Sequence, residues 1–227
     1  MTNVRPPGAP PEILPLRLRD VPAALAAGMR GLIHAPLRSF ACGAPFALGV
    51  ALLPLAGPGL LAGLAFLLPP AFAVLSGAGG FAVLRQRGGA LLALACLAAL
   101  GCLVWLLGAW GIATAFPGAL VNWRWLVLPE RIMLAGAELS FLLVMAAALH
   151  AALVMAVAMV VTHGTDPVTA VLHSVSALRE NLPAMSLWAV TCAALALAAS
   201  VPRGAGLVVG VPLLAHANAE LARRALR

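Results

Sequence analysis

TDPVTAVLHSVSALRENLPAMSLWAV, at residues 165–190, carries the clearest structural pattern in this chain. Asp166 followed by Pro167 is typical of a helix start, because the Asp side chain caps free N–H groups and Pro suits the first helical position. The residues that follow repeat at helical spacing and are Val168, Val171, Leu172, Val175, Leu178 and Leu182. The pattern predicts an amphipathic helix that lies on a membrane surface.

Two apolar runs follow this helix, at residues 183–201 and 204–221, with the turn VPRGAG at residues 201–206 between them. The first run is shorter than the roughly 20 residues that usually cross a bilayer. The amphipathic helix before it could continue into it, so we expect both runs to be membrane spans.

The composition also indicates a membrane protein. Of 227 residues, 63% are hydrophobic and 9% are charged, whereas soluble domains carry about 25% charged residues. The net charge of +7 comes from arginines at the ends of apolar runs, where they contact lipid headgroups rather than nucleic acid. We therefore predict an all-α polytopic membrane bundle whose partners are the lipid bilayer and other membrane proteins or a second copy of the chain.

The order of segments gives the domain organisation. We predict a flexible cytoplasmic tail at residues 1–19 and a single membrane domain at residues 20–227. Asp20 is expected to cap an interfacial helix that ends near Pro36. Further spans are expected at residues 37–54, from the turn at residues 57–59 to Arg85, at residues 89–116 and at residues 132–161, the last two forming a central hairpin. The total is six spans and two interfacial amphipathic helices.

The arginines give an orientation. With six spans, eleven arginines fall on the side of the termini and three on the other, at positions 124, 131 and 203. Because cytoplasmic loops carry the excess of arginine, we expect both termini in the cytoplasm of a bacterial cell, with the chain in the inner membrane.

A weak internal repeat accompanies this topology. A shift of 147 positions aligns Leu25 with Leu172, Pro36 with Pro183, Ser39 with Ser186, Leu48 with Leu195, Gly57 with Gly204, Gly59 with Gly206 and Gly63 with Gly210. The repeat-like units are residues 20–85 and 166–221, and the two spans between them keep both units pointing the same way. Parallel repeats of this kind occur in transporters, although a duplicated scaffold would look the same.

Four glycines are candidates for helix packing. Gly59 and Gly63 open one span of the first unit, and Gly206 and Gly210 open the matching span of the second. Small residues four apart let the backbones of membrane helices approach closely. We expect these helices to pack against each other or against their hairpin partners.

Two histidines within expected spans are the candidate cofactor ligands. His150 lies near the middle of the span at residues 132–161 and could be a haem or metal ligand, a proton relay, or a residue bonded to a neighbouring helix. A second haem ligand at the same depth is missing, because His216 sits about 8 Å nearer the cytoplasmic end at 1.5 Å of rise per residue. We expect no cofactor.

The sequence signals for a metal site or a catalytic site are weaker. His163, Asp166 and His173 lie near one another in the sequence, and a metal site can be imagined there, but Asp166 already has a role as a helix cap. The sequence holds no nucleophile elbow, P-loop, HExxH or Gly-rich phosphate loop. We therefore expect no catalytic residues, no metal site and no enzymatic activity.

Three segments carry a resemblance to a known family: RLRDVPAALAAGMRGLIHAPLRSF at residues 17–40, the stretch at residues 165–190, and GLVVGVPLLAHANAEL at residues 206–221. The chain resembles the uncharacterised bacterial integral membrane family called domain of unknown function 2189. The resemblance implies a six-span membrane protein. It implies no particular activity, because none is established for the family.

The leading expectation is a non-enzymatic inner-membrane protein that serves as an accessory, assembly or structural subunit through contacts with other membrane proteins. The alternative is a small transporter or channel with a site between the two units, and a haem-binding redox protein is a weaker alternative.

Overall fold

The computed structural model describes residues 11–57, 60–76, 80–115, 149, 152–200 and 204–226. Within these ranges the regular structure is helical, apart from a bridge between Ile13 and Leu226. The elements are α1 (Asp20–His34), α2 (Pro36–Ala56), α3 (Leu60–Ser76), α4 (Ala82–Ala115), α7 (Ala156–Ala158), the π-helix η1 (Met159–His163), α8 (Pro167–Glu180), α9 (Leu182–Ser200) and α10 (Leu207–Ala225). The all-α fold class is confirmed.

Among the helices that the structure describes, three are long and apolar enough to cross a membrane, namely Pro36–Leu53 within α2, Ala82–Gly108 within α4 and Leu182–Ala199 within α9. α3 is apolar but shorter. These helices agree with the membrane protein that the composition predicts.

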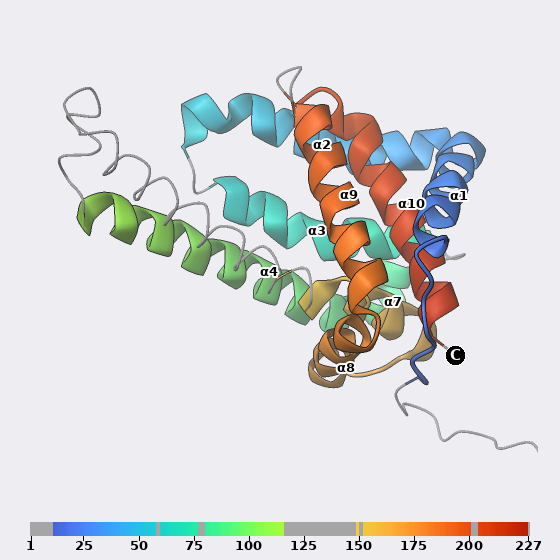
Figure 1. The fold of residues 1–227 in the computed structure, drawn as a ribbon. Coiled ribbons are helices and arrows are strands. Elements are labelled where there is room, and N and C mark those ends of the chain that lie inside the picture. The colour runs from blue at the N-terminus through green and yellow to red at the C-terminus, as the bar shows by residue number, and fades with distance from the viewer. Residues whose placement is uncertain are drawn as a thin grey trace, which may run out of the picture.

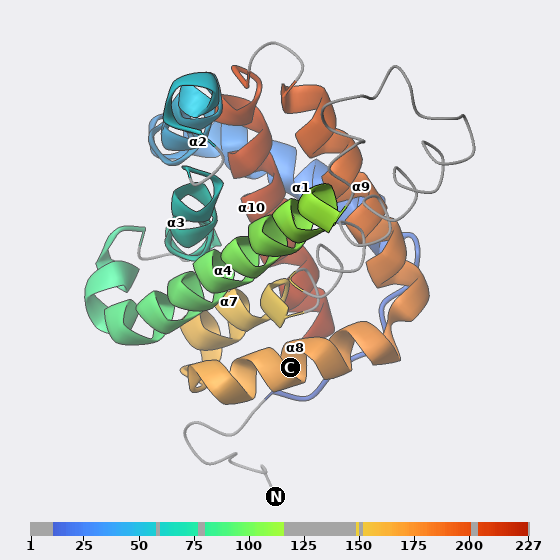
Figure 2. The ribbon, with the colours of Figure 1, turned by 90° about the vertical axis from the view of Figure 1, so that its left-hand side faces the viewer.

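Helix α10 lies at the centre of the described structure and packs against α1, α2, α3 and α9. α8 lies at the end of α9, and α3 packs along α4 (Figure 1). Helices α2 and α4 run across the direction of α9 in both views (Figures 1 and 2). The three candidate spans therefore do not share one axis, as they would in a simple parallel bundle.

The break expected at residues 85–87 is a kink within α4 and not an open loop. α3 ends at Ser76 and α4 begins at Ala82, so the break between them comes earlier than Arg85. A kink remains at Arg87, whose backbone is non-helical with φ −123° and ψ 16°. The expected second span is thus shorter and the third begins earlier than the charge pattern indicated.

The N-terminal segment differs from the expected flexible tail over residues 11–19. The Leu14 N–H donates to the carbonyl oxygen of Ala225 at 2.7 Å, next to the Ile13–Leu226 bridge. The Leu16 N–H donates to Asn181 Oδ1, and Ile13 and Leu16 pack against the core. This segment, the N-terminal strap, joins the end of α10 to the junction of α8 and α9.

The two repeat-like units have similar helix boundaries. Helices begin at residues 20, 36 and 60 in the first unit and at residues 167, 182 and 207 in the second. The turns between the paired apolar helices contain Gly57 with φ 75° and Gly204 with φ 81°, a left-handed conformation that glycine adopts without strain. The Gly turns expected at both positions are confirmed.

Candidate functional site

The described part of the segment before α8, residues 152–163 near the end of the expected fourth span, is not one regular helix. Residues 156–158 form a single α-helical turn and residues 159–163 a π-helix, while Val154 and Met155 lie in a turn. The Met155 N–H donates to Ser174 Oγ at 3.1 Å, and Asn218 Nδ2 donates to the carbonyl oxygen of Val154 at 2.6 Å. These two side chains stabilise the break, because a backbone group without a partner is costly in apolar surroundings.

A cavity of about 560 Å³ adjoins this break. Its wall comes from α3, α4, α9, α10 and the broken segment, so it lies between helices of both repeat-like units. The wall is apolar, with Leu68 and Phe72 from α3, Val154 and Val157 from the break, and Trp188 from α9. A volume between about 300 and 1,000 Å³ with predominantly apolar walls is typical of small-molecule sites.

Asn218 is the one amide side chain in this wall as the described residues define it. It is 5% exposed, and its Nδ2 is occupied by the bond to Val154. Its Oδ1 has no hydrogen-bond partner among the described residues. A buried acceptor without a partner costs about 1–3 kcal/mol, and Asn218 bears this cost while its amide nitrogen holds the Val154 carbonyl.

The structure gives His216 a role in helix packing. Its Nε2 lies 3.1 Å from Ser39 Oγ of α2. A Cβ added at Gly31 of α1 would come within 2.7 Å of the His216 ring. His216 thus joins α10 to both N-terminal helices, while His150, its proposed counterpart, lies outside the described residues.

The four packing glycines have different surroundings. A Cβ added at Gly206 would lie 2.7 Å from the carbonyl oxygen of Ala199, and one at Gly210 would lie 3.0 Å from Ala199 Cβ. These two glycines therefore pack against α9, their hairpin partner. Gly63 is exposed, and a Cβ added there would meet nothing within 4 Å. Gly59 lies outside the described residues.

Other glycines make the closest helix contacts with α10. A Cβ at Gly28 of α1 would lie 2.7 Å from the carbonyl oxygen of Leu213 and 2.8 Å from Ala217 Cβ. Gly43 of α2 similarly meets the backbone of Val208. The sequence analysis did not single out Gly28, Gly31 or Gly43, because small residues reveal nothing about which partner lies opposite.

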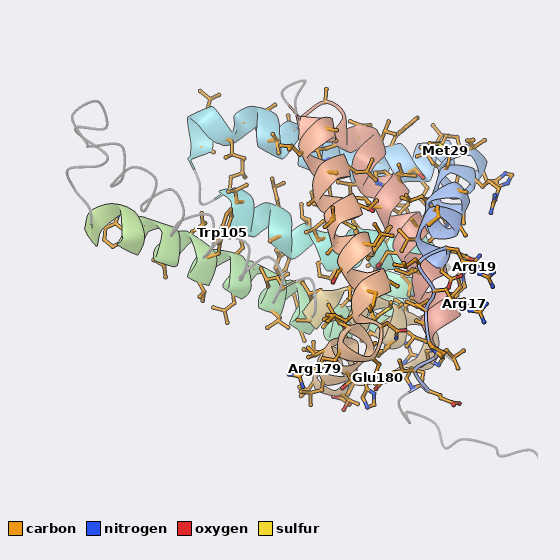
Figure 3. All side chains as sticks on the ribbon, in the orientation of Figure 1. Arg17, Arg19, Met29, Trp105, Arg179 and Glu180 are labelled. Carbon is orange, nitrogen blue, oxygen red and sulfur yellow. The ribbon has the colours of Figure 1, made fainter. Side chains whose placement is uncertain are left out.

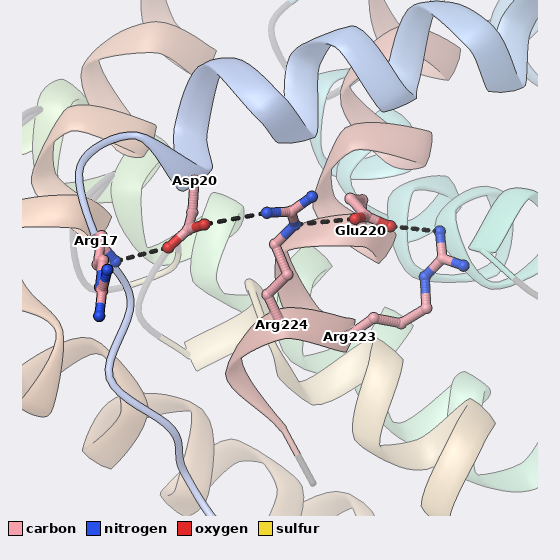
Figure 4. A network of polar contacts seen from close by, with 5 residues as sticks. All are labelled: Arg17, Asp20, Glu220, Arg223 and Arg224. Carbon is pink, nitrogen blue, oxygen red and sulfur yellow. Dashed lines mark hydrogen bonds and ion pairs between the residues drawn. The ribbon is translucent and has the colours of Figure 1, made fainter.

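An ion-pair network joins the two ends of the chain (Figure 4). Asp20 accepts from the Arg17 N–H at 2.7 Å and from Arg224 Nη1 at 3.0 Å. Glu220 pairs with Arg223 at 2.8 Å and with Arg224 at 2.9 Å. Asp20 is the first residue of α1 and makes no side-chain cap for it. The expected capping role is replaced by this network.

Both expected interfacial helices expose apolar side chains beside charged ones. On α1, Met29 lies on the outer surface and the strap before it carries Arg17 and Arg19 (Figure 3). On α8, Val168 and Leu172 are exposed. Asp166 caps α8 by accepting from the N–H groups of residues 168 and 169 at 3.1 and 3.0 Å. The cap predicted at Asp166 is confirmed.

The His163, Asp166 and His173 region holds no metal centre in the part of the chain that the structure describes, where no group of three or more His, Cys, Asp or Glu residues is placed to hold an ion.

Comparison with family models, with curated proteins and with solved structures finds no match to this chain. Sequence reasoning missed Asn218, although an Asn inside the apolar run at residues 204–221 is a signal of the kind that marks functional positions in membrane helices.

Proposed function

We propose that this protein is a non-enzymatic bacterial inner-membrane protein that serves as an accessory, assembly or structural subunit through contacts with other membrane proteins or a second copy of itself. One observation carries the proposal. An exposed apolar row runs along α4 at intervals of three and four residues, through Leu92, Cys96, Leu100, Leu103, Leu107 and Trp110. That spacing is the one with which helices pack side by side.

The surface of α3 adds support. Gly63 leaves open space on an apolar helix, and small residues are where membrane helices approach each other most closely. Leu67, four residues further on, is also exposed. A partner helix could therefore lie against this face without displacing any side chain of the described chain.

The test is purification in a mild detergent, followed by mass measurement of the purified particle. The proposal expects a complex with a constant second component or a defined homo-oligomer. Replacing Gly63 by Leu should weaken that complex, because the new side chain fills the space left for the partner. A monomer alone, unchanged by this substitution, would contradict the proposal.

We also propose six spans with both termini in the cytoplasm. The arginine distribution, the matching helix boundaries of the two units and the paired turns at Gly57 and Gly204 support this topology and a parallel repeat. The crossed directions of α2, α4 and α9 weigh against a simple parallel arrangement of the spans. The resemblance to the family called domain of unknown function 2189 also implies six spans. Membership of that family is a hypothesis.

A transporter with a site between the units is the second candidate, and the cavity between α3, α4, α9 and α10 favours it. Its apolar wall suits an apolar cargo better than an ion or sugar. Flux of such a cargo in liposomes that contain the purified protein tests this candidate. Haem binding remains a weaker hypothesis, which an absorbance spectrum of the purified protein tests.

A further inference from the structure

We infer that the N-terminal strap is a latch on the junction between α8 and α9. While the strap is docked, it fixes the backbone of Asn181, which sets the angle between the two helices. When the strap detaches, α8 tilts about this residue. The inference goes beyond the proposed subunit role, because it concerns a movement within the chain and needs no partner.

Asn181 is a single non-helical residue between two helices. α8 ends at Glu180 and α9 begins at Leu182, and the Asn181 backbone has φ −119° and ψ 30°. Its N–H donates to the carbonyl oxygen of Ala177 at 3.1 Å in the last turn of α8, and its own carbonyl oxygen accepts from the Met185 N–H at 2.9 Å in the first turn of α9. Residues at the ends of elements absorb the backbone changes of hinge movements, so Asn181 has the position of a hinge.

The side chain of Asn181 ties the strap to this hinge. Asn181 is 3% exposed. Its Oδ1 accepts from the Leu16 N–H, and its Nδ2 donates to the carbonyl oxygen of Ala177 at 3.1 Å. If the strap left, the buried Oδ1 would lose its donor, which is costly unless the junction also moves and lets water reach the group. The strap and the junction should therefore open together.

The strap is attached lightly enough to detach before the protein unfolds. The Leu14 N–H bonds to Ala225, and the side chains of Ile13 and Leu16 are half-buried against the core, while Pro15 between them is exposed. Segments with few buried contacts open at a small fraction of the free energy of global unfolding. Pro15 limits the conformations of the detached strap, so less entropy is lost when the strap docks again.

Helix α8 is the element that the latch would release. It packs against α4, α9 and the irregular segment formed by α7 and η1. The bond from the Met155 N–H to Ser174 holds the middle of α8, so the movement is a tilt and not a separation. Val168 and Leu172 are exposed on this helix. The latch therefore lets the N-terminal end of the chain control the direction in which the exposed apolar side chains of α8 point.

The test is a distance measurement between two spin labels by pulsed electron paramagnetic resonance on the full-length protein in lipid nanodiscs. In a background without the native cysteines, Leu172→Cys on α8 and Leu197→Cys on α9 carry the labels, because both positions are exposed and lie on opposite sides of the hinge. With the strap intact, one narrow distance distribution is expected. Leu16→Pro removes the N–H that bonds to Asn181 and should shift this distribution or add a second, broader population.

Leu18→Pro is the matched control. It makes the same substitution two residues further along the strap, at the second position of the turn from Arg17 to Asp20, where proline is favoured. The Leu18 N–H makes no bond to another helix in the part of the chain that the structure describes. The distance distribution in this variant should match that of the labelled protein with the intact strap.

Amide hydrogen exchange gives a second measurement that needs no variant. If the strap and the junction open together, the N–H groups of Leu16 and Asn181 should show the same protection in the native protein. In Leu16→Pro, the Asn181 N–H should exchange about fivefold to tenfold faster, as expected for the loss of one net hydrogen bond.

Some results would overturn the inference. They are an unchanged distance distribution in Leu16→Pro, an equal shift in Leu18→Pro, or clearly different protection of the Leu16 and Asn181 N–H groups in the native protein. If a variant fails to fold, hydrogen exchange of the native protein still decides.

Discussion

Asp20 in the first turn of α1 and Arg224 in the last turn of α10 form an ion pair, with 3.0 Å between Asp20 Oδ1 and Arg224 Nη1. The pair lies beside the N-terminal strap, whose Leu14 N–H bonds to the Ala225 carbonyl, so residues 14–20 are joined to the last turn of α10. The backbone N–H of Arg17, followed by the Arg224 side chain, lowers the pKa of Asp20, and partial burial opposes this shift.

The lowered pKa of Asp20 predicts a pH dependence of stability. A carboxyl group whose pKa is lower in the folded than in the unfolded chain stabilises the fold above its unfolded pKa, and this contribution is lost as the pH falls through the folded pKa. The pH range over which Asp20 stops stabilising the fold therefore lies below 3.8, the ordinary pKa of an Asp side chain.

Replacing Asp20 by Asn should lower the free energy of unfolding at neutral pH by less than about 1 kcal/mol, because the pair is exposed. The difference from the native protein should shrink as the pH falls below 3.8. Thermal unfolding in detergent between pH 7 and pH 3 measures it. A difference that stays constant over this range would mean that the Asp20 charge does not stabilise the fold.

Asn181 should hold the N-terminal strap. Its Oδ1 accepts from the Leu16 N–H, and its Nδ2 donates to the carbonyl of Ala177 at 3.1 Å. Asn181→Ala should cost about 1–3 kcal/mol, as expected when buried hydrogen bonds are lost, and should speed amide hydrogen exchange at residues 13–16. Ser176→Ala is the control, because that exposed hydroxyl bonds only within α8 in the described structure. Equal exchange in both variants would contradict the role given to Asn181.

Gly28 should be intolerant of a side chain, whereas Gly63 should accept one. Gly28→Ala places a methyl group within 2.8 Å of Ala217 Cβ, and overpacking of this kind costs about 1–3 kcal/mol. Gly63→Ala meets open space and should gain up to about 1 kcal/mol from helix propensity. The unfolding temperatures of the two purified variants should therefore move in opposite directions relative to that of the native protein. A loss of stability in Gly63→Ala matching that in Gly28→Ala would contradict this assignment.

The six-span topology predicts which residues are reachable from outside the cell. In a background without the native cysteines, Leu55→Cys near the turn at Gly57 should react with a membrane-impermeant thiol reagent added to intact cells. Arg179→Cys on α8 should react only after permeabilisation. If both cysteines react from the same side, Leu55 and Arg179 lie on one side of the membrane and the six-span topology is wrong. The crossed directions of α2 and α9 are compatible with that outcome.

Local signals in the sequence account for the parts of the fold that were predicted. The Asp166 cap, the helix that follows it and the turns at Gly57 and Gly204 depend on residues close together in the chain, and each was found. The break at residues 154–155 depends on Ser174 and Asn218, which belong to other helices. Periodicity within one segment could not reveal it.

The candidate site was less predictable for the same reason. Asn218 belongs to the site because its side chain bonds to Val154, 64 residues earlier in the chain. The walls of the pocket that it lines come from four helices. The N-terminal strap was also missed. It is held by backbone N–H groups that bond to Ala225 and Asn181, and such bonds cannot be recognised from the residue types of a Pro-rich segment. The charged residues 85–87 predicted the position of a break, which is a kink at Arg87 and not an open loop.

The most direct test of the account is site-specific photocross-linking in living cells. A photoreactive phenylalanine at Leu107, which is 65% exposed on the α4 row, should form a cross-link of constant mass to one membrane protein or to a second copy of the chain. The same group at Leu94, which is 1% exposed on the same helix, should give only cross-links within the chain. Cross-links at Leu107 to lipid alone would contradict the proposal that this protein works by contacts with other membrane proteins.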